Sequence, residues 1–79
     1  MRLPRDLSGE ALAAKLAVLG YTVTRQRGDH LRLTTTLRGE HHVTIPRHSP
    51  LKMGTLAAVL ADVAAHFEFS RDELLEKLF

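Results

Sequence analysis

The sequence predicts an α+β fold with the element order α-β-β-β-α, in which helices cover one face of a three-stranded antiparallel sheet. Two stretches with helical periodicity flank three short stretches in which β-forming residues alternate in polarity. Turn-forming residues separate the three short stretches. Because 79 residues are too few for two hydrophobic cores, we expect one domain over residues 1–79.

Two long helices are expected over residues 9–19 and 55–66. Ser8 and Gly20 suit the two ends of the first helix, since serine caps helix N-termini and glycine adopts the left-handed conformation that often ends a helix. Each helix carries an apolar stripe at helical spacing: Leu12, Leu16 and Leu19 in the first, and Leu56, Val59, Leu60 and Val63 in the second. Ser70-Arg71-Asp72-Glu73 has the form of a capping box and predicts a short final helix.

Three strands are expected over residues 21–27, 31–37 and 41–46. Gly28-Asp29 and Arg38-Gly39-Glu40 are typical of the turns between them. Successive side chains of a strand point to opposite faces, so the face away from the helices should be polar. Its expected residues are Thr22, Thr24, Gln26, Arg32, Thr34, His42 and Thr44.

The alternation in the first strand conflicts with a two-residue turn at residues 28–29. If Val23 faces the core together with Leu33, such a turn has the wrong parity, so a bulge or a three-residue loop must intervene. Gly28 suits such a position because glycine tolerates positive φ. His30 should then lie at the tip or the first rung of the hairpin, partly exposed.

Positive charge is concentrated in the middle of the chain. The net charge is +2, but residues 21–54 hold six Arg or Lys against two acids, and residues 55–79 hold five acids against two basic residues. This distribution favours a polyanion-facing surface, although an ordinary solvated arginine-rich sheet explains the charge equally well. The candidate phosphate-binding residues are Arg25, Arg27, Arg32, Arg47 and Lys52. Strand parity points Arg32 outward and places Arg25 with Val23, so we expect Arg32 to contribute more than Arg25.

Several classes of chemistry have no support in the sequence. Without cysteine there is no disulfide and no thiolate, which fits a reducing cytoplasm. His41 and His42 are adjacent in a strand and point to opposite faces, and no carboxylate cluster completes a ligand set, so we expect neither a metal nor another cofactor. No apolar run approaches the roughly 20 residues that span a bilayer.

Histidine among arginines remains as the candidate chemistry. RNA carries its own nucleophile, the 2′-hydroxyl, and its cleavage needs a proton acceptor, a proton donor and cations that stabilise the phosphate. Histidine exchanges protons near neutral pH, and arginine binds phosphate through two hydrogen bonds. His30 is therefore the candidate catalytic residue, although surface histidines in loops are common. His66, at a helix end, fits a helix-terminal cation or a surface residue better.

Four segments in order resemble the HicA (YcfA-type) toxin family. Residues 20–30 resemble the helix end, strand and Gly-Ser-His turn of that family, and residues 43–48 resemble its third strand with proline and a following histidine. Residues 52–56 resemble its Lys-Gly-Thr-Leu entry to the second helix, and the tail at residues 69–75 also fits. His30 matches the position of the catalytic histidine. Asp29 stands where the family usually has serine or threonine.

The resemblance implies a fold similar to double-stranded-RNA-binding domains. It also implies an mRNA endonuclease that uses one histidine, and inhibition by a HicB-type antitoxin encoded beside it. A carboxylate at Asp29 could orient His30, or it could repel the phosphate. Two other functions stay open: a non-catalytic RNA-binding domain, and a protein-interaction module whose basic surface binds an acidic partner.

Overall fold

The computed structural model describes residues 3–48 and 50–79 and confirms the α-β-β-β-α order. The elements are α1 (Gly9–Leu16), the short 3-10 helix η1 (Ala17–Leu19), β1 (Thr22–Arg27), β2 (His30–Thr35), β3 (His41–Pro46), α2 (Met53–Phe67) and α3 (Arg71–Leu78). Three expected boundaries differ by one residue, at the starts of β1 and β2 and the end of α2, and two differ by two residues. The second strand ends at Thr35 rather than at residue 37, and α2 begins at Met53 rather than at residue 55.

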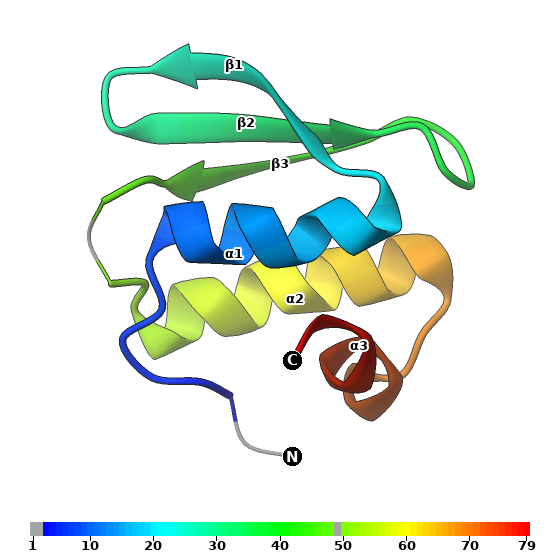
Figure 1. The fold of residues 1–79 in the computed structure, drawn as a ribbon. Coiled ribbons are helices and arrows are strands. Elements are labelled where there is room, and N and C mark those ends of the chain that lie inside the picture. The colour runs from blue at the N-terminus through cyan, green and yellow to red at the C-terminus, as the bar shows by residue number, and fades with distance from the viewer. Residues whose placement is uncertain (1–2, 49) are drawn as a thin grey trace.

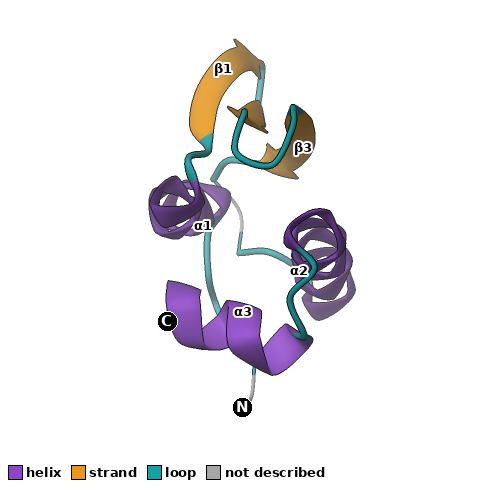
Figure 2. Ribbon diagram, turned by 90° about the vertical axis from the view of Figure 1, so that its right-hand side faces the viewer, coloured by secondary structure: helices purple, strands orange, loops and turns teal. Residues whose placement is uncertain are grey.

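The molecule has three layers, which Figure 1 shows with the sheet uppermost. The strands form an antiparallel sheet in the order β1-β2-β3, so β1 and β3 are its two edges. Helices α1 and α2 lie side by side beneath the sheet, and α3 lies below them (Figure 2). One sheet face is therefore covered by helices, as the sequence predicted, and the other face is open.

The hydrophobic core fills the space between the sheet and the helices. Leucines of the predicted α1 and α2 stripes meet alternate residues of β2 and β3 there, and Tyr21 joins them with only 2 % of its surface exposed. Leu74, Leu75 and Leu78 of α3 close the core from the third layer. Within the part of the chain that the structure describes, no helix combines the length and the apolar character that crossing a membrane requires.

Local side-chain chemistry fixes the helix ends as the sequence predicted. The Ser8 hydroxyl accepts a hydrogen bond from the backbone N–H of Ala11, and Gly20 ends the α1–η1 helical stretch with φ 82°. Ser70 and Glu73 form the complete capping box of α3. The hydrogen bonds from the backbone and the hydroxyl of Ser70 hold the pKa of the Glu73 carboxyl below its usual value.

The bulge that the parity argument required lies at Thr24, and its predicted place at Gly28 was wrong. Val23 lies opposite Leu33, but the next pair along the ladder is Arg25 and Arg32, so Thr24 is the extra residue of β1. Beyond it every side chain of β1 changes face. Arg25 therefore joins Arg32 on the open face instead of sharing the orientation of Val23, which corrects the expected difference between the two arginines.

The same change of face corrects the position of Gln26. This residue lies opposite the buried Leu31, so its side chain is on the helix side of the sheet and not on the polar face. The turn itself has two residues, because Arg27 and His30 are paired across it. Gly28 has φ 57° there, which fits hairpin turns that need positive φ at the first central residue.

The first residue of α1 is packed directly against the end of β3. A Cβ atom added to Gly9 would lie 1.6 Å from the Pro46 carbonyl oxygen and 2.7 Å from its carbon. The next residue donates its backbone N–H to the Arg47 carbonyl at 3.1 Å, and an isolated bridge pairs Ser8 with Pro50. Only glycine allows this close approach of helix and strand.

We expect Gly9→Ala to lower the free energy of unfolding by about 3 kcal/mol or more, because the overlap is with backbone that cannot rotate away. Gly54→Ala is the matched control, since nothing lies within 4 Å of its added Cβ. It should leave stability unchanged or raise it by up to about 1 kcal/mol through helix propensity. Urea unfolding followed by circular dichroism measures both. Equal stability of the two variants would contradict the contact.

Candidate nucleic-acid interface

A shallow depression of about 290 Å³ lies on the open face of the sheet, at the end that carries the β1–β2 turn. Three arginines, one histidine and one threonine line it: Arg25, Arg27, Arg32, His30 and Thr44. Four of these five residues were predicted as site residues. The structure therefore brings together His30 and three of the five candidate phosphate-binding side chains.

The register of the strands explains why these charges meet. Arg25 lies directly opposite Arg32, and Arg27 lies opposite His30. Like charges placed opposite each other in a sheet disfavour folding, so the arrangement costs stability in the free protein. A polyanion bound on this face would neutralise the repulsion. The arginines present several guanidinium donors to one side of the sheet, which is the chemistry that binds phosphate groups.

His30 is the first residue of β2 and is exposed, as expected for the first rung of the hairpin. Within residues 3–48 and 50–79 its imidazole makes no hydrogen bond to another side chain. Both ring nitrogens are therefore available to a bound molecule. Catalytic histidines are commonly oriented by a second group, and here no described residue supplies that group to His30.

Asp29 accepts hydrogen bonds from the segment that follows β3. Its backbone carbonyl accepts a hydrogen bond from the N–H of Arg47 at 2.7 Å, and its carboxylate accepts one from the N–H of His48 at 3.3 Å. The imidazole Nε2 of His48 lies 3.8 Å from the same carboxylate oxygen. The hydrogen bond of the Asp29 carboxylate is thus directed to residue 48. This contact joins residues far apart in the chain, and the sequence analysis missed it.

The other two candidate phosphate-binding residues lie outside the depression. The Arg47 guanidinium donates from Nε to the Glu10 carboxylate at 3.1 Å, on the side of the sheet that α1 covers. Lys52 is exposed at the N-terminal end of α2. Neither side chain lines the depression.

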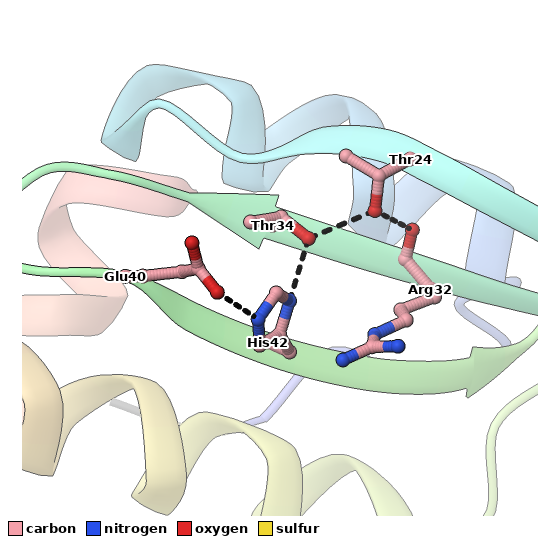
Figure 3. A network of polar contacts seen from close by, with 5 residues as sticks. All are labelled: Thr24, Arg32, Thr34, Glu40 and His42. Atoms are coloured by element: carbon pink, nitrogen blue, oxygen red, sulfur yellow. Dashed lines mark hydrogen bonds and ion pairs between the residues drawn. The ribbon is translucent and has the colours of Figure 1, made fainter.

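A chain of hydrogen bonds crosses the same open face at its other end (Figure 3). The Glu40 carboxylate is 2.8 Å from His42 Nε2, His42 Nδ1 is 2.7 Å from the Thr34 hydroxyl, and that hydroxyl is 2.8 Å from the hydroxyl of Thr24. A carboxylate only accepts, so Nε2 of His42 carries a hydrogen and Nδ1 of the neutral ring accepts from Thr34. This network ties all three strands together and confirms that Thr24, Thr34 and His42 share the polar face.

A second cluster lies on the helix side at the start of β3. The Tyr21 hydroxyl is 2.7 Å from Nδ1 of His41, whose Nε2 is 3.1 Å from the Asp62 carboxylate. The His41 ring is stacked on His66 with 4.5 Å between ring centroids, and His66 donates from Nε2 to the Leu37 carbonyl. His66 thus fastens the β2–β3 turn to α2, a role that the sequence analysis did not identify.

Burial raises the pKa of Tyr21 to about 12, and the negative charge of Asp62 adds to the effect. This cluster is a polar part of the core, and it lies at the end of the sheet opposite to His30. No group of three or more His, Asp or Glu side chains among the described residues is placed to hold a metal ion.

The fold and the depression define a small α+β protein whose open sheet face suits a polyanion. Residues 9–64, more than half of the chain, match the family model described as the HicA toxin of bacterial toxin–antitoxin systems. The chain therefore belongs to the HicA toxin family, which confirms the resemblance. Searches of curated proteins and of solved structures returned no match.

The buried hydroxyl of Tyr21 should titrate at unusually high pH. The chain has one tyrosine and no tryptophan, so tyrosinate absorbance reports Tyr21 alone. We expect a midpoint near pH 12 in the folded protein and near pH 10 in concentrated urea. Because the unfolded chain loses this proton first, stability should fall as the pH rises from 10 towards 12.

Two variants control this titration. Asp62→Asn should lower the Tyr21 midpoint, because it removes a negative charge that opposes tyrosinate. Tyr21→Phe should lack this part of the fall in stability. A midpoint near pH 10 in the folded parent protein would contradict the burial of the hydroxyl group.

Proposed function

We propose that this chain is the toxin of a HicA/HicB-type toxin–antitoxin system, a metal-independent endoribonuclease of the cytoplasm that cuts mRNA with His30. The proposal covers residues 1–79 as one HicA-like domain. A HicB-type antitoxin is its protein partner and mRNA is its substrate. The expected similarity to double-stranded-RNA-binding domains belongs to the same proposal and stays a prediction.

One observation supports this function above the others: His30, whose ring is bonded to no described side chain, lies in a depression with three arginines. Phosphate contacts supply most of the affinity of proteins for nucleic acids, and arginines on one face supply such contacts without regard to sequence. The open face has no helix above it, so an extended RNA strand can cross it (Figure 2).

The proposed reaction needs only the groups in this depression. A base removes the proton of the 2′-hydroxyl, the 2′-oxygen forms a bond to the adjacent phosphorus, and the bond from phosphorus to the 5′-oxygen breaks. The departing 5′-oxygen takes up a proton, which leaves a 2′,3′-cyclic phosphate and a 5′-hydroxyl end. His30 exchanges a proton with one of these oxygens, and the arginines stabilise the extra negative charge on the phosphate.

A non-catalytic RNA-binding domain is the second candidate. The observation in its favour is that no described residue orients the His30 imidazole. In free enzymes, catalytic hydrogen bonds are often incomplete and form only with substrate, so this observation does not decide between the two functions. Binding without cleavage by the parent protein would establish the second candidate.

We expect His30→Ala to reduce the rate of RNA cleavage by roughly 10²–10⁴, because a positioned proton-transfer group is lost. The fold should be kept, since the side chain is exposed at the start of β2. Gel analysis of a labelled RNA in excess EDTA measures the rate, and circular dichroism checks folding. DNA of the same sequence should stay intact because it lacks the 2′-hydroxyl.

His42→Ala is the matched control for this experiment. It removes another histidine from the same sheet face, but one that is engaged by Glu40 and Thr34 at the far end. We expect it to cut RNA at nearly the parental rate. If His30→Ala cuts as fast as the parent, or if chelation stops the parent protein, the proposed mechanism is wrong.

Arg25→Ala and Arg32→Ala should weaken RNA binding by similar amounts, because the Thr24 bulge places both arginines on the open face. Each should also reduce the dependence of log affinity on log salt by about one phosphate contact. Affinities are measured on a His30→Ala background so that cleavage does not interfere. Arg38→Ala is the control. Arg38 lies in the β2–β3 turn, outside the depression, and its guanidinium is paired with the Glu68 carboxylate. Unchanged affinity in both test variants would place RNA on another face.

A further inference from the structure

The inner side of strand β1, which carries Val23 and Gln26, is only partly covered. Val23 and Leu33 are cross-strand neighbours on the same sheet face, yet Val23 is 50 % exposed and Leu33 only 1 %. Both views of the fold show β1 as the strand farthest from α2, with no element beyond it (Figures 1 and 2). The helix layer therefore covers the inner side of β1 only in part.

A groove of about 360 Å³ lies at this position, between β1 and α1. Its lining residues are Ala13, Val23, Leu31, Gln26, Glu10 and Arg47. The two charged residues are paired with each other at 3.1 Å, so they offer no free charge to a ligand. The groove is thus suited to small or medium apolar side chains that enter from the edge of the sheet.

The backbone of β1 offers hydrogen bonds at the same edge. Arg27 and His30 close a two-residue turn, and residues in that position exchange backbone hydrogen bonds. Hydrogen-bonded and non-hydrogen-bonded pairs alternate along an antiparallel ladder, so the N–H and C=O of Gln26 are directed away from β2. An unpaired edge of this kind accepts an added strand.

One side of this edge carries positive charge, and the other side carries none on β1. Arg25 and Arg27 project to the open face, whereas Val23 and Gln26 project to the groove. Within the described chain β1 contains no acidic residue and no acidic residue lines the depression beside it. A strand paired with β1 would therefore meet positive charge on one face and an apolar groove on the other.

We propose that the antitoxin partner docks by adding an extended strand to the open edge of β1, and that acidic side chains alternate with apolar ones in that strand. The proposal rests on the toxin–antitoxin function proposed above. The acidic side chains pair with Arg25 and Arg27, the apolar ones enter the groove beside Val23, and the backbone bonds to Gln26. Such a strand lines the rim of the RNA-binding depression and neutralises two of its arginines without contacting His30.

A second copy of this chain fits the edge poorly. Pairing two β1 strands would bring four arginine side chains together on one face, which is unfavourable without counter-charges. Charged residues and bulges on edge strands also oppose self-association, and β1 has both. Charge complementarity therefore favours an acidic partner.

The probe for the test is a synthetic eight-residue peptide of alternating Glu and Val, blocked at both ends, with a Lys and Val peptide as its control. The protein is the full chain, labelled with ¹⁵N, and no RNA is present. Titration to millimolar peptide should shift β1 amide resonances and slow hydrogen exchange at Gln26. The lysine peptide should not bind, because it presents like charge to the arginines.

Three variants separate the parts of the site. Gln26→Pro removes the edge N–H, and since that group is not used in the sheet the fold should persist. It should weaken binding of the glutamate peptide by about fivefold or more, the effect of one lost hydrogen bond. Val23→Thr should also weaken binding, whereas Val18→Thr should not, because Val18 is exposed too but lies outside the groove.

Several results would overturn the proposal. No change at β1 amides with saturating glutamate peptide, equal binding of the lysine peptide, or equal loss in both valine variants would each do so. A concentration-dependent dimer of the free chain that Gln26→Pro abolishes would identify a second copy as the occupant instead. The peptide titration contains no RNA, so its outcome does not depend on whether the protein cuts RNA. A failure of strand addition is therefore distinguished from a failure of the proposed function.

Discussion

The backbone of Gly9 passes so close to the Pro46 carbonyl that helix α1 and strand β3 are locked in one relative position. The chain after β3 depends on this contact. Residue 47 bonds through its carbonyl to the N–H of Glu10 and through its N–H to the carbonyl of Asp29. The start of the first helix is thereby connected, through one residue, to the turn that positions His30. A site on a hairpin turn gains its rigidity here from backbone contacts to a helix rather than from burial of its own side chains.

The Thr24 bulge has an equally local cause and a wider effect. One extra residue in β1 lets Val23 keep the face of Leu33 while Arg25 and Arg27 both reach the open face. Without the bulge, strict alternation would point Val23, Arg25 and Arg27 to the same side of the strand. The bulge thus concentrates positive charge on one face and leaves Val23 half-exposed on the other. The two surfaces proposed to bind RNA and antitoxin arise from this single irregularity.

The sequence predicted the elements well because their signals are local. Serine caps, glycine ends, apolar stripes and alternating strands each depend on neighbours within a few residues, and His30 with three arginines could be placed near one turn. The position of the bulge could not be predicted, because Gly28 and Thr24 both satisfy the parity requirement and cross-strand packing decides between them. The bonds of Asp29 to His48 and of Tyr21 to His41 join distant segments, so no local pattern signals them.

The open face is not uniform, and this limits how RNA can lie on it. No acid lines the depression at its arginine end, where the Asp29 carboxylate bonds to residue 48, whereas the other end carries Glu40, bonded to His42 (Figure 3). A phosphate chain running along the strands would meet the Glu40 carboxylate, but one crossing them at the turn end would pass over the depression that the three arginines and His30 line. If His42 takes up a proton, Thr34 can donate to Thr24 and Thr24 to the Arg32 carbonyl 3.4 Å away, so no group in the network loses its partner. The network therefore keeps Glu40 in place in both charge states of His42, and the proposed path across the strands is preserved.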